Sequence, residues 1–209
     1  WRLRIAKRQK NPLSGEDGEV LSKLVGPDAE GDTLTELELL HNCIFLLNAG
    51  HETTANTVTN GVDALLRFPD QLDRLRADPE LIVSGVEELL RFESSVQLNN
   101  RKLTADAEIG GVAMNKGDYV WLCIGAANRD PAEFPDPDAI DIGRDRNKHL
   151  AFGSGIHACA GMSLGRMEIR IALNGLVQRF GQIEPSGTAL HHPRARFRGF
   201  VDYPVTASV

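Results

Sequence analysis

The stretch Phe152-Gly153-Ser154-Gly155-Ile156-His157-Ala158-Cys159-Ala160-Gly161 carries more information about the fold than any other part of the chain. Its glycines allow a tight loop whose backbone can approach a flat ligand. Cys159 is expected at the start of a helix that runs to about Phe180, where the helix dipole and free N–H groups favour a thiolate. Phe152 can cover one face of a bound group, and Gly161 lets the helix approach it. A glycine-rich turn around an inert, buried cysteine is the alternative interpretation.

Composition excludes several classes of protein. The chain has 209 residues, of which 42% are apolar and 25% charged, as in a soluble globular protein. A net charge of −6 argues against nucleic-acid binding, and no long apolar run predicts a membrane span. The N-terminus lacks the features of a signal peptide, so we expect a cytoplasmic protein. It also lacks an initiator Met, which leads us to expect that the chain begins inside a longer protein.

The three cysteines do not form a disulfide framework or a zinc site, because they are far apart and form no CxxC pair. Cys43 and Cys123 lie among apolar residues and are expected to be small buried hydrophobes. Cys159 lies among small residues and near His157. This setting differs from that of the other two cysteines, so we expect Cys159 to have a chemical function.

Apolar periodicity and helix breakers predict an α+β fold that is mainly helical. Thr33 and Glu36 form a candidate capping box for one long helix over residues 34–68. Its apolar content is so continuous that we expect it to be buried on several sides. Other expected helices cover residues 1–12, 13–25, 69–76, 81–92 and 159–180. Strands over residues 108–114 and 119–126 are expected to pair around a turn at 115–118, followed by a long loop over 128–148 and short strands in the tail.

A second group of reactive side chains lies inside the long helix, in Ala49-Gly50-His51-Glu52-Thr53-Thr54. Gly50 weakens a helix by roughly 1 kcal/mol relative to Ala. Thr53 can bend it by bonding a carbonyl one turn back, so that a small groove opens. Glu52 and Thr53 offer a carboxylate and a hydroxyl that can relay protons. A threonine-rich kink in a core helix is the alternative.

Charged residues give three weaker signals. Glu88 and Arg91 share one helix face and can form an ion pair, which on a solvated helix contributes only ~0.3 kcal/mol. Arg101 and His157 are candidate carboxylate ligands or, alternatively, exposed surface charges.

These segments resemble, in order along the chain, the motifs of soluble, bacterial-type cytochromes P450. The decisive stretch resembles the family's Phe-x-x-Gly-x-x-x-Cys-x-Gly signature at Phe152, Gly155, Cys159 and Gly161, with Gly153 and His157 as bacterial-type additions. The resemblance implies the cytochrome P450 fold, with a long central helix, small antiparallel sheets and a cysteine-ligand loop. It also implies haem b (iron protoporphyrin IX) as cofactor, with the Cys159 thiolate as axial ligand of the iron.

The same resemblance assigns roles to the other motifs. In the long helix, Ala49 and Gly50 would border the haem, Thr53 would bond dioxygen and Glu52 would support proton delivery. Glu88 and Arg91 would form a structural triad with Arg144, which lies in the loop before the cysteine. Arg101 and His157 would bind the haem propionates.

The resemblance implies a haem-thiolate monooxygenase that inserts one oxygen atom of dioxygen into a small apolar organic substrate. Electrons would come from a ferredoxin or a flavoprotein. Residues 96–100 and 45–49 are expected to line the substrate pocket. Arg166 and Arg170 either dock an acidic electron donor or are solvated helix charges.

The motifs cover only the C-terminal half of the family's catalytic domain, so residues 1–209 are expected to be the C-terminal part of one haem domain. Two other functions stay open. The first is a truncated, non-catalytic haem-binding protein, or one half of a split enzyme that pairs with the missing N-terminal half. The second is a peroxide-driven hydroxylase. The pair Glu52 and Thr53 favours oxygen chemistry, because neither a simple haem binder nor a peroxide-driven enzyme needs it.

Overall fold

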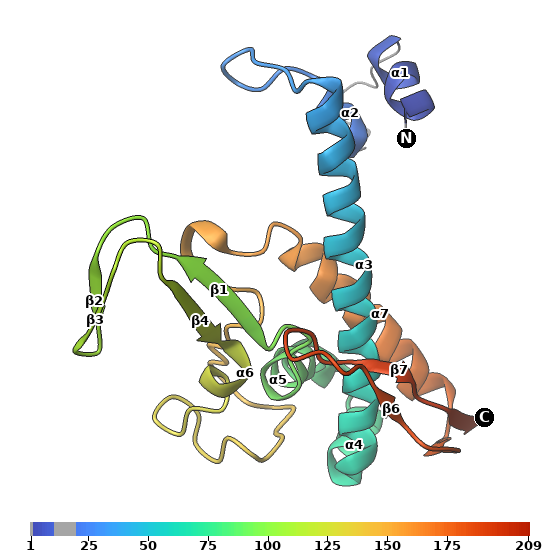
Figure 1. Cartoon of the computed structure of the whole chain (residues 1–209). Helices are drawn as coiled ribbons and strands as arrows, with labels where there is room; N and C mark the ends of the chain where they lie inside the picture. Colours follow the sequence, from blue (N-terminus) through green and yellow to red (C-terminus); the bar gives the residue numbers. More distant parts are fainter. Residues whose placement is uncertain (1, 11–19) are drawn as a thin grey trace. The chain divides into compact units, whose positions relative to one another are not determined.

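The structure, a computed structural model, describes residues 2–10 and 20–209 (Figure 1). Its internal contacts divide the chain into a unit that ends at Glu52 and a unit that begins at Thr53. The first unit contains α1 (Arg2–Lys10), α2 (Val20–Val25) and the start of α3 (Glu36–Arg67). Its small core consists of Ile5, Leu21, Leu39 and Cys43. Of the helix expected over 13–25, residues 20–25 are helical and 13–19 lie outside the described residues.

The long helix is present, but its N-terminal cap differs from the expected one. Thr35 and Glu38 form the capping box, in place of Thr33 and Glu36. The backbone N–H of Thr35 donates to Glu38 Oε2 at 2.8 Å, and the N–H of Glu38 donates to Thr35 Oγ1 at 3.3 Å. The helix therefore begins two residues later than expected, because the second Thr-x-x-Glu pair satisfies the free N–H groups.

The second unit contains the rest of the secondary structure. Its elements are the end of α3, α4 (Pro69–Ala77), η2 (Pro79–Leu81), α5 (Ile82–Phe92), β1 (Leu98–Lys102), β2 (Ala107–Ile109), β3 (Val112–Met114), β4 (Tyr119–Cys123), α6 (Ile124–Ala127), η3 (Gly155–His157), α7 (Met162–Arg179), β5 (Gln182–Pro185), β6 (Leu190–His191), β7 (Phe200–Asp202) and β8 (Val205–Ser208). The strands form four two-stranded antiparallel sheets: β1–β4, β2–β3, β5–β8 and β6–β7. The mainly helical α+β architecture is as expected.

The strand pairing predicted for residues 108–126 is wrong. β4 pairs with β1, with Arg101 opposite Val120, and residues 124–127 form the short helix α6. Residues 107–114 form a hairpin of their own, closed by Gly110 and Gly111 with φ of 58° and 79°. Positive φ at both central residues defines a type I′ turn, for which Gly-Gly is a known signal. In Figure 1 this hairpin extends beyond the β1–β4 sheet.

The core of the second unit lies between the end of α3 and helices α4, α5 and α7 (Figure 1). Leu65, Leu89 and Leu173 are buried there, and each contributes roughly 1.5–3 kcal/mol of hydrophobic stabilisation. A Cβ at Gly61 would lie 3.1 Å from Leu173 Cδ1, so glycine allows α3 to approach α7 closely. This packing holds α5 and α7, which carry most of the charged residues described below.

The expectation that α3 is buried on several sides is wrong for residues 44–51, all of which are exposed. Phe45 is 65% exposed and Leu47 is 57% exposed. Apolar content alone predicts that a residue prefers burial, but the packing partner must come from elsewhere in the fold. Among the described residues, no helix is both long and apolar enough to cross a membrane.

Candidate haem-ligand site

The cysteine loop, residues 150–161, is a tight turn closed by its own backbone. Gly153 and Gly155 have φ of 69° and 63°, a conformation that L side chains rarely adopt. A Cβ at Gly153 would also lie 3.2 Å from the carbonyl oxygen of His157. The N–H of Cys159 donates to the carbonyl of Phe152 at 2.8 Å and closes the loop. Both glycines are therefore required by the path of the backbone.

Cys159 lies just outside the final helix, and the predicted helix start at Cys159 is wrong. α7 begins at Met162 with Gly161 as its N-cap, and the N–H of Met162 donates to the carbonyl of Cys159 at 3.2 Å. The cysteine remains directly N-terminal to α7, so the helix dipole still favours negative charge there. Cys159 is exposed, and a Cβ at Gly161 would lie 3.9 Å from its sulfur. The loop thus presents a sulfur that can bind an approaching metal.

The other two cysteines differ from each other. Cys43 is buried, as expected, whereas Cys123 is exposed, which contradicts the prediction. Cys123 ends β4, and four of the five residues of that strand are exposed. An apolar run does not by itself decide which face of a two-stranded sheet is covered.

The structure brings Glu88, Arg91 and Arg144 together in a buried network. Arg91 donates two hydrogen bonds to Glu88, each 2.8 Å, and the side chains of both residues are fully buried. Arg144 Nε lies 3.0 Å from Glu88 Oε2. Asn147, which was not predicted, donates to the same oxygen at 2.9 Å. This network ties α5 to the long loop that precedes the cysteine, because a buried charge needs such partners.

A second unpredicted residue, Asn128, links this network to the cysteine loop. Asn128 is fully buried, and its carbonyl accepts a bond of 3.0 Å from Arg91. Its side-chain oxygen accepts the N–H of Leu150 at 2.7 Å. The residue could be suspected from Asn128-Arg129-Asp130-Pro131, a cluster of turn-forming residues, but its partners are 22 and 37 positions away.

Glu87, next to Glu88, organises a separate cluster. Arg166 Nε lies 2.8 Å and 3.0 Å from the two Glu87 oxygens, and His149 Nε2 lies 3.1 Å from Oε2. Arg170 is also close, with its nitrogen 3.6 Å from Glu87. Arg166 and Arg170, considered above as docking or solvated charges, thus form ion pairs within the chain. Partial burial raises the pKa of Glu87, but hydrogen bonds from His149 and Arg166 outweigh it and lower the pKa to about 2.

The remaining predicted residues lie as follows. Arg101 is on β1 and half-buried, and its NH1 donates to the carbonyl of Asn100 at 2.8 Å. His157 is in η3 of the cysteine loop and is exposed. Ala49, Gly50 and Glu52 belong to the first unit and Thr53 to the second. α3 is α-helical through all of them, and Ala49 and Gly50 are exposed. The bend expected near Thr53 stays a prediction.

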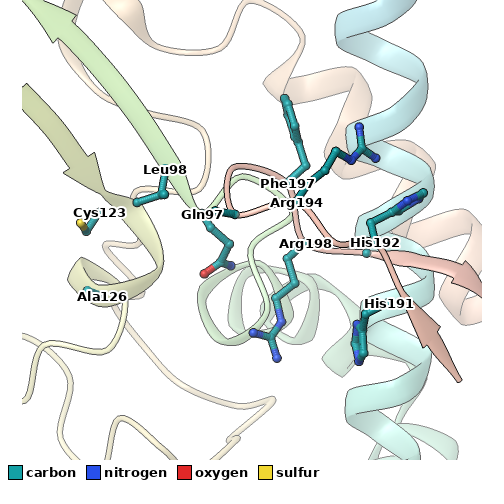
Figure 2. A pocket seen from close by; sticks show the side chains of 11 residues that line it. Gln97, Leu98, Cys123, Ala126, His191, His192, Arg194, Phe197 and Arg198 are labelled. Atoms are coloured by element: carbon teal, nitrogen blue, oxygen red, sulfur yellow. The ribbon is translucent and has the colours of Figure 1, made fainter. Parts of the chain in front are cut away.

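A cavity of about 500 Å³ lies elsewhere in the second unit (Figure 2). Two of its lining residues belong to a backbone pairing, in which the N–H of Gln97 donates to the carbonyl of Arg196 at 2.9 Å and the N–H of Arg198 donates to the carbonyl of Ser95 at 2.8 Å. Figure 2 shows Leu98, Cys123 and Ala126 on one side and Arg194, His192 and His191 on the other. Gln97 and Leu98, from the segment expected to line a substrate pocket, line this cavity.

Comparison with known proteins identifies the class to which this fold belongs. The family model for cytochrome P450 matches residues 2–207. The chain is 43% identical over 203 residues to the biotin biosynthesis cytochrome P450 of Bacillus subtilis, covering 97% of this chain and 50% of that protein. It is 42% identical over 197 residues to the cytochrome P450 monooxygenase PikC of Streptomyces venezuelae, covering 91% and 47%. The chain therefore belongs to the cytochrome P450 family, as the resemblance of its motifs implied.

Solved structures agree with this fold. The crystal structure of P450BioI in complex with a hexadec-9Z-enoic acid ligated acyl carrier protein has a TM-score of 0.89 at 43% identity, covering 98% of this chain and 51% of that one. The cytochrome P450 PksS of Bacillus subtilis has a TM-score of 0.92 at 35% identity, covering 100% and 54%. The chain spans about half the length of the relatives it matches.

Haem b is the cofactor expected of this family, and the cysteine loop fits it. A thiolate ligand needs an accessible sulfur, and Cys159 is exposed. A flat macrocycle needs close approach of the backbone, and residues 153–161 include three glycines, of which Gly161 lies beside the sulfur. Ile156 is 98% exposed and offers an apolar contact. This donor set suits a haem iron, which a cysteine thiolate can hold.

Proposed function

We propose that this chain forms the haem-ligating part of a cytochrome P450 monooxygenase, in which the Cys159 thiolate would hold the haem iron. The observation that carries the proposal is the position of Cys159: exposed, beside Gly161, in a loop closed by the bond from its own N–H to Phe152. The names of its relatives support the same reaction class. The substrate would be a small apolar organic molecule, the oxidant dioxygen, and the electron donor a ferredoxin or a flavoprotein.

Haem b, when bound to a thiolate, supplies an electron-rich iron that favours cleavage of the O–O bond. The chain's own residues would hold and orient the haem and would deliver protons. Cys159 Sγ would hold the iron, and Arg101 and His157 would bind the propionates as charge-assisted hydrogen-bond donors. Glu52 and Thr53 would hold and pass protons through a carboxylate and Thr53 Oγ1. The triad of Glu88, Arg91 and Arg144 would keep the loop in place.

We also propose that the cavity in Figure 2 contributes to the substrate compartment. Leu98 and Phe197 form an apolar part of its wall, as expected for an apolar substrate. Gln97 can orient a polar group of the substrate. The relative P450BioI was solved in complex with an acyl carrier protein to which hexadec-9Z-enoic acid is ligated. Fatty acyl chains are therefore a sensible first class of compounds to test.

The test is a difference spectrum of the reduced, haem-loaded chain with and without carbon monoxide. A Soret band at the position of thiolate-ligated haem is expected for the wild type and should be lost in Cys159→Ser. Cys123→Ser is the matched control, because Cys123 is also exposed and should leave the band unchanged. A band typical of histidine ligation, or the same band in Cys159→Ser, would contradict the assignment.

Turnover separates this proposal from the other two functions. A monooxygenase consumes dioxygen and reduced electron donor together and forms a hydroxylated product. A non-catalytic haem-binding protein would show the carbon monoxide band without product. A peroxide-driven hydroxylase would form product with peroxide alone. The presence of Glu52 and Thr53 favours the first outcome, because that pair serves proton delivery to dioxygen.

A further inference from the structure

The two neighbouring glutamates on α5 have separate partners. Glu88 is bound by Arg91, Arg144 and Asn147, as described above. Glu87 is bound by His149 from the entrance of the cysteine loop and by Arg166 from α7. Glu87 therefore bridges three segments that are far apart in the sequence and that meet around the loop.

Arg166 reaches the cysteine loop through a second contact. Its guanidinium carbon lies 4.6 Å from the centroid of the Phe152 ring, within the range for a cation–π interaction. The ring also packs against α7 at Gly165, where a Cβ would lie 3.7 Å from Phe152 Cε1. Glu87 binds the guanidinium through both of its oxygens, which fixes the plane of Arg166 above the ring.

His149 holds the same N-terminal end of the loop by a hydrogen bond. Its side chain is 2% exposed. Nδ1 accepts the N–H of Ala151 at 3.2 Å, so the other ring nitrogen, Nε2, is the one that donates to Glu87. Ala151, directly before Phe152, is thereby held by a hydrogen bond to the His149 ring.

Phe152 is the residue through which these contacts reach the sulfur. Its ring is held by Arg166, and its carbonyl accepts the N–H of Cys159 at 2.8 Å. A shift of Phe152 would therefore move the backbone that carries the thiolate. The electron density that a cysteine ligand gives to iron depends on its surroundings and its hydrogen bonds.

We propose that Glu87, His149 and Arg166, here called the Glu87 clamp, position Phe152 and thereby set the ligand properties of Cys159. The clamp acts through Phe152 and is a positioning device, separate from the Glu88 triad. This inference rests on the proposed haem-ligand role of Cys159. The low pKa of Glu87 agrees with this proposal, because a carboxylate that stays ionised keeps its ion pair with Arg166 over a wide pH range.

The test compares two variants with a matched control in the 209-residue chain. Glu87→Gln removes the charge at constant size. Arg166→Lys keeps the charge but loses the planar group that covers Phe152. Glu93→Gln is the control, because Glu93 is a buried carboxylate that bridges Arg67 and Arg198, on segments other than the cysteine loop.

The first readout is amide hydrogen exchange of residues 150–160 in the haem-free chain. About tenfold faster exchange is expected in Glu87→Gln and in Arg166→Lys. In the wild type the loop can open only by breaking the contacts of the clamp, and in the variants these contacts are already weakened. Glu93→Gln should leave this segment at the wild-type rate. Wild-type exchange in both clamp variants would overturn the proposal, and so would equally fast exchange in the control.

The second readout is the Soret band of the reduced carbon monoxide complex and the reduction potential of the haem-loaded chain. Both are expected to shift in the two clamp variants and not in Glu93→Gln. Faster exchange with an unchanged Soret band and reduction potential would overturn the proposal that the clamp sets the ligand properties of Cys159. Failure of the wild type to bind haem counts against the proposed function alone; the exchange experiment then still decides whether the clamp holds the loop.

Discussion

Glu88 illustrates how one residue can hold several segments together. Its carboxylate is fully buried and is shared by Arg91, Arg144, Asn147 and the N–H of Asp141. Glu88→Gln would leave two arginines without their counter-charge in the interior. We expect a loss of about 3–5 kcal/mol in the free energy of unfolding, the usual effect of removing one partner of a buried pair.

Urea unfolding followed by circular dichroism measures this loss. Glu184→Gln on β5 is the control, because Glu184 is exposed and its replacement should change stability by no more than about 0.5 kcal/mol. Equal midpoints for the two variants would contradict a structural role for the triad.

Glu87 gives a prediction about acid stability. Its pKa is about 2 in the folded chain against an ordinary value of 4.5. A carboxyl whose pKa is lowered by folding contributes stability above its unfolded pKa and loses that contribution as the pH falls through its folded pKa. Unfolding free energies measured between pH 5 and about pH 2 should therefore fall more steeply for the wild type than for Glu87→Gln. Parallel profiles would show that the carboxylate is not stabilised by its partners.

At the scale of single elements, glycine has different roles at one position in α7 and at one position in α3. Gly175 lies inside α7, and a Cβ there would have no neighbour within 4 Å. Gly175→Ala is expected to raise stability by about 0.5–1 kcal/mol, because alanine favours the helix and limits the unfolded chain. Thermal unfolding measures the change.

Gly61 on α3 is the matched comparison for this substitution. A Cβ there would lie 3.1 Å from Leu173 and 3.4 Å from Leu89, both on packed helices. The gain in helix propensity should therefore be offset by overpacking in Gly61→Ala. A larger gain at Gly61 than at Gly175 would contradict this account of the interface between α3 and α7.

At the scale of the whole chain, α7 has apolar residues on two opposite faces. Ile169, Leu173 and Val177 are buried in the core. Leu164, Met167 and Ile171 lie on the other face and are 54%, 52% and 68% exposed. At 100° per residue the mean directions of the two sets are about 150° apart. An exposed apolar face of this kind promotes association and dye binding.

We therefore expect the chain to bind the hydrophobic dye ANS and to self-associate as its concentration rises. Met167→Glu combined with Ile171→Lys should reduce both effects without changing the circular dichroism spectrum. Val83→Gln is the control, because Val83 is an exposed apolar residue on α5 and lies outside this stripe. Dye fluorescence and sedimentation measure the outcome; an unchanged signal in the double variant would assign the effect to another surface.

Local features of the sequence predicted the parts of the structure that depend on short spacing. The position of Cys159 in a glycine loop, the long helix over most of residues 34–68 and the pairing of Glu88 with Arg91 all depend on residues within a few positions of each other. The turn signal Gly110-Gly111 was also present in the sequence, although a continuous strand was predicted there. In each case the geometry of a turn or helix relates residue type directly to conformation.

Only the tertiary structure decided which distant segments meet. It paired β4 with β1, exposed Cys123 and the middle of α3, and brought His149 and Arg166 to Glu87 across 62 and 79 positions. A charged or apolar side chain has many possible partners at such separations, and the choice among them depends on packing of the whole unit. The amino-acid sequence by itself therefore identified Cys159 as the ligand candidate, whereas the fold determined how its loop is held.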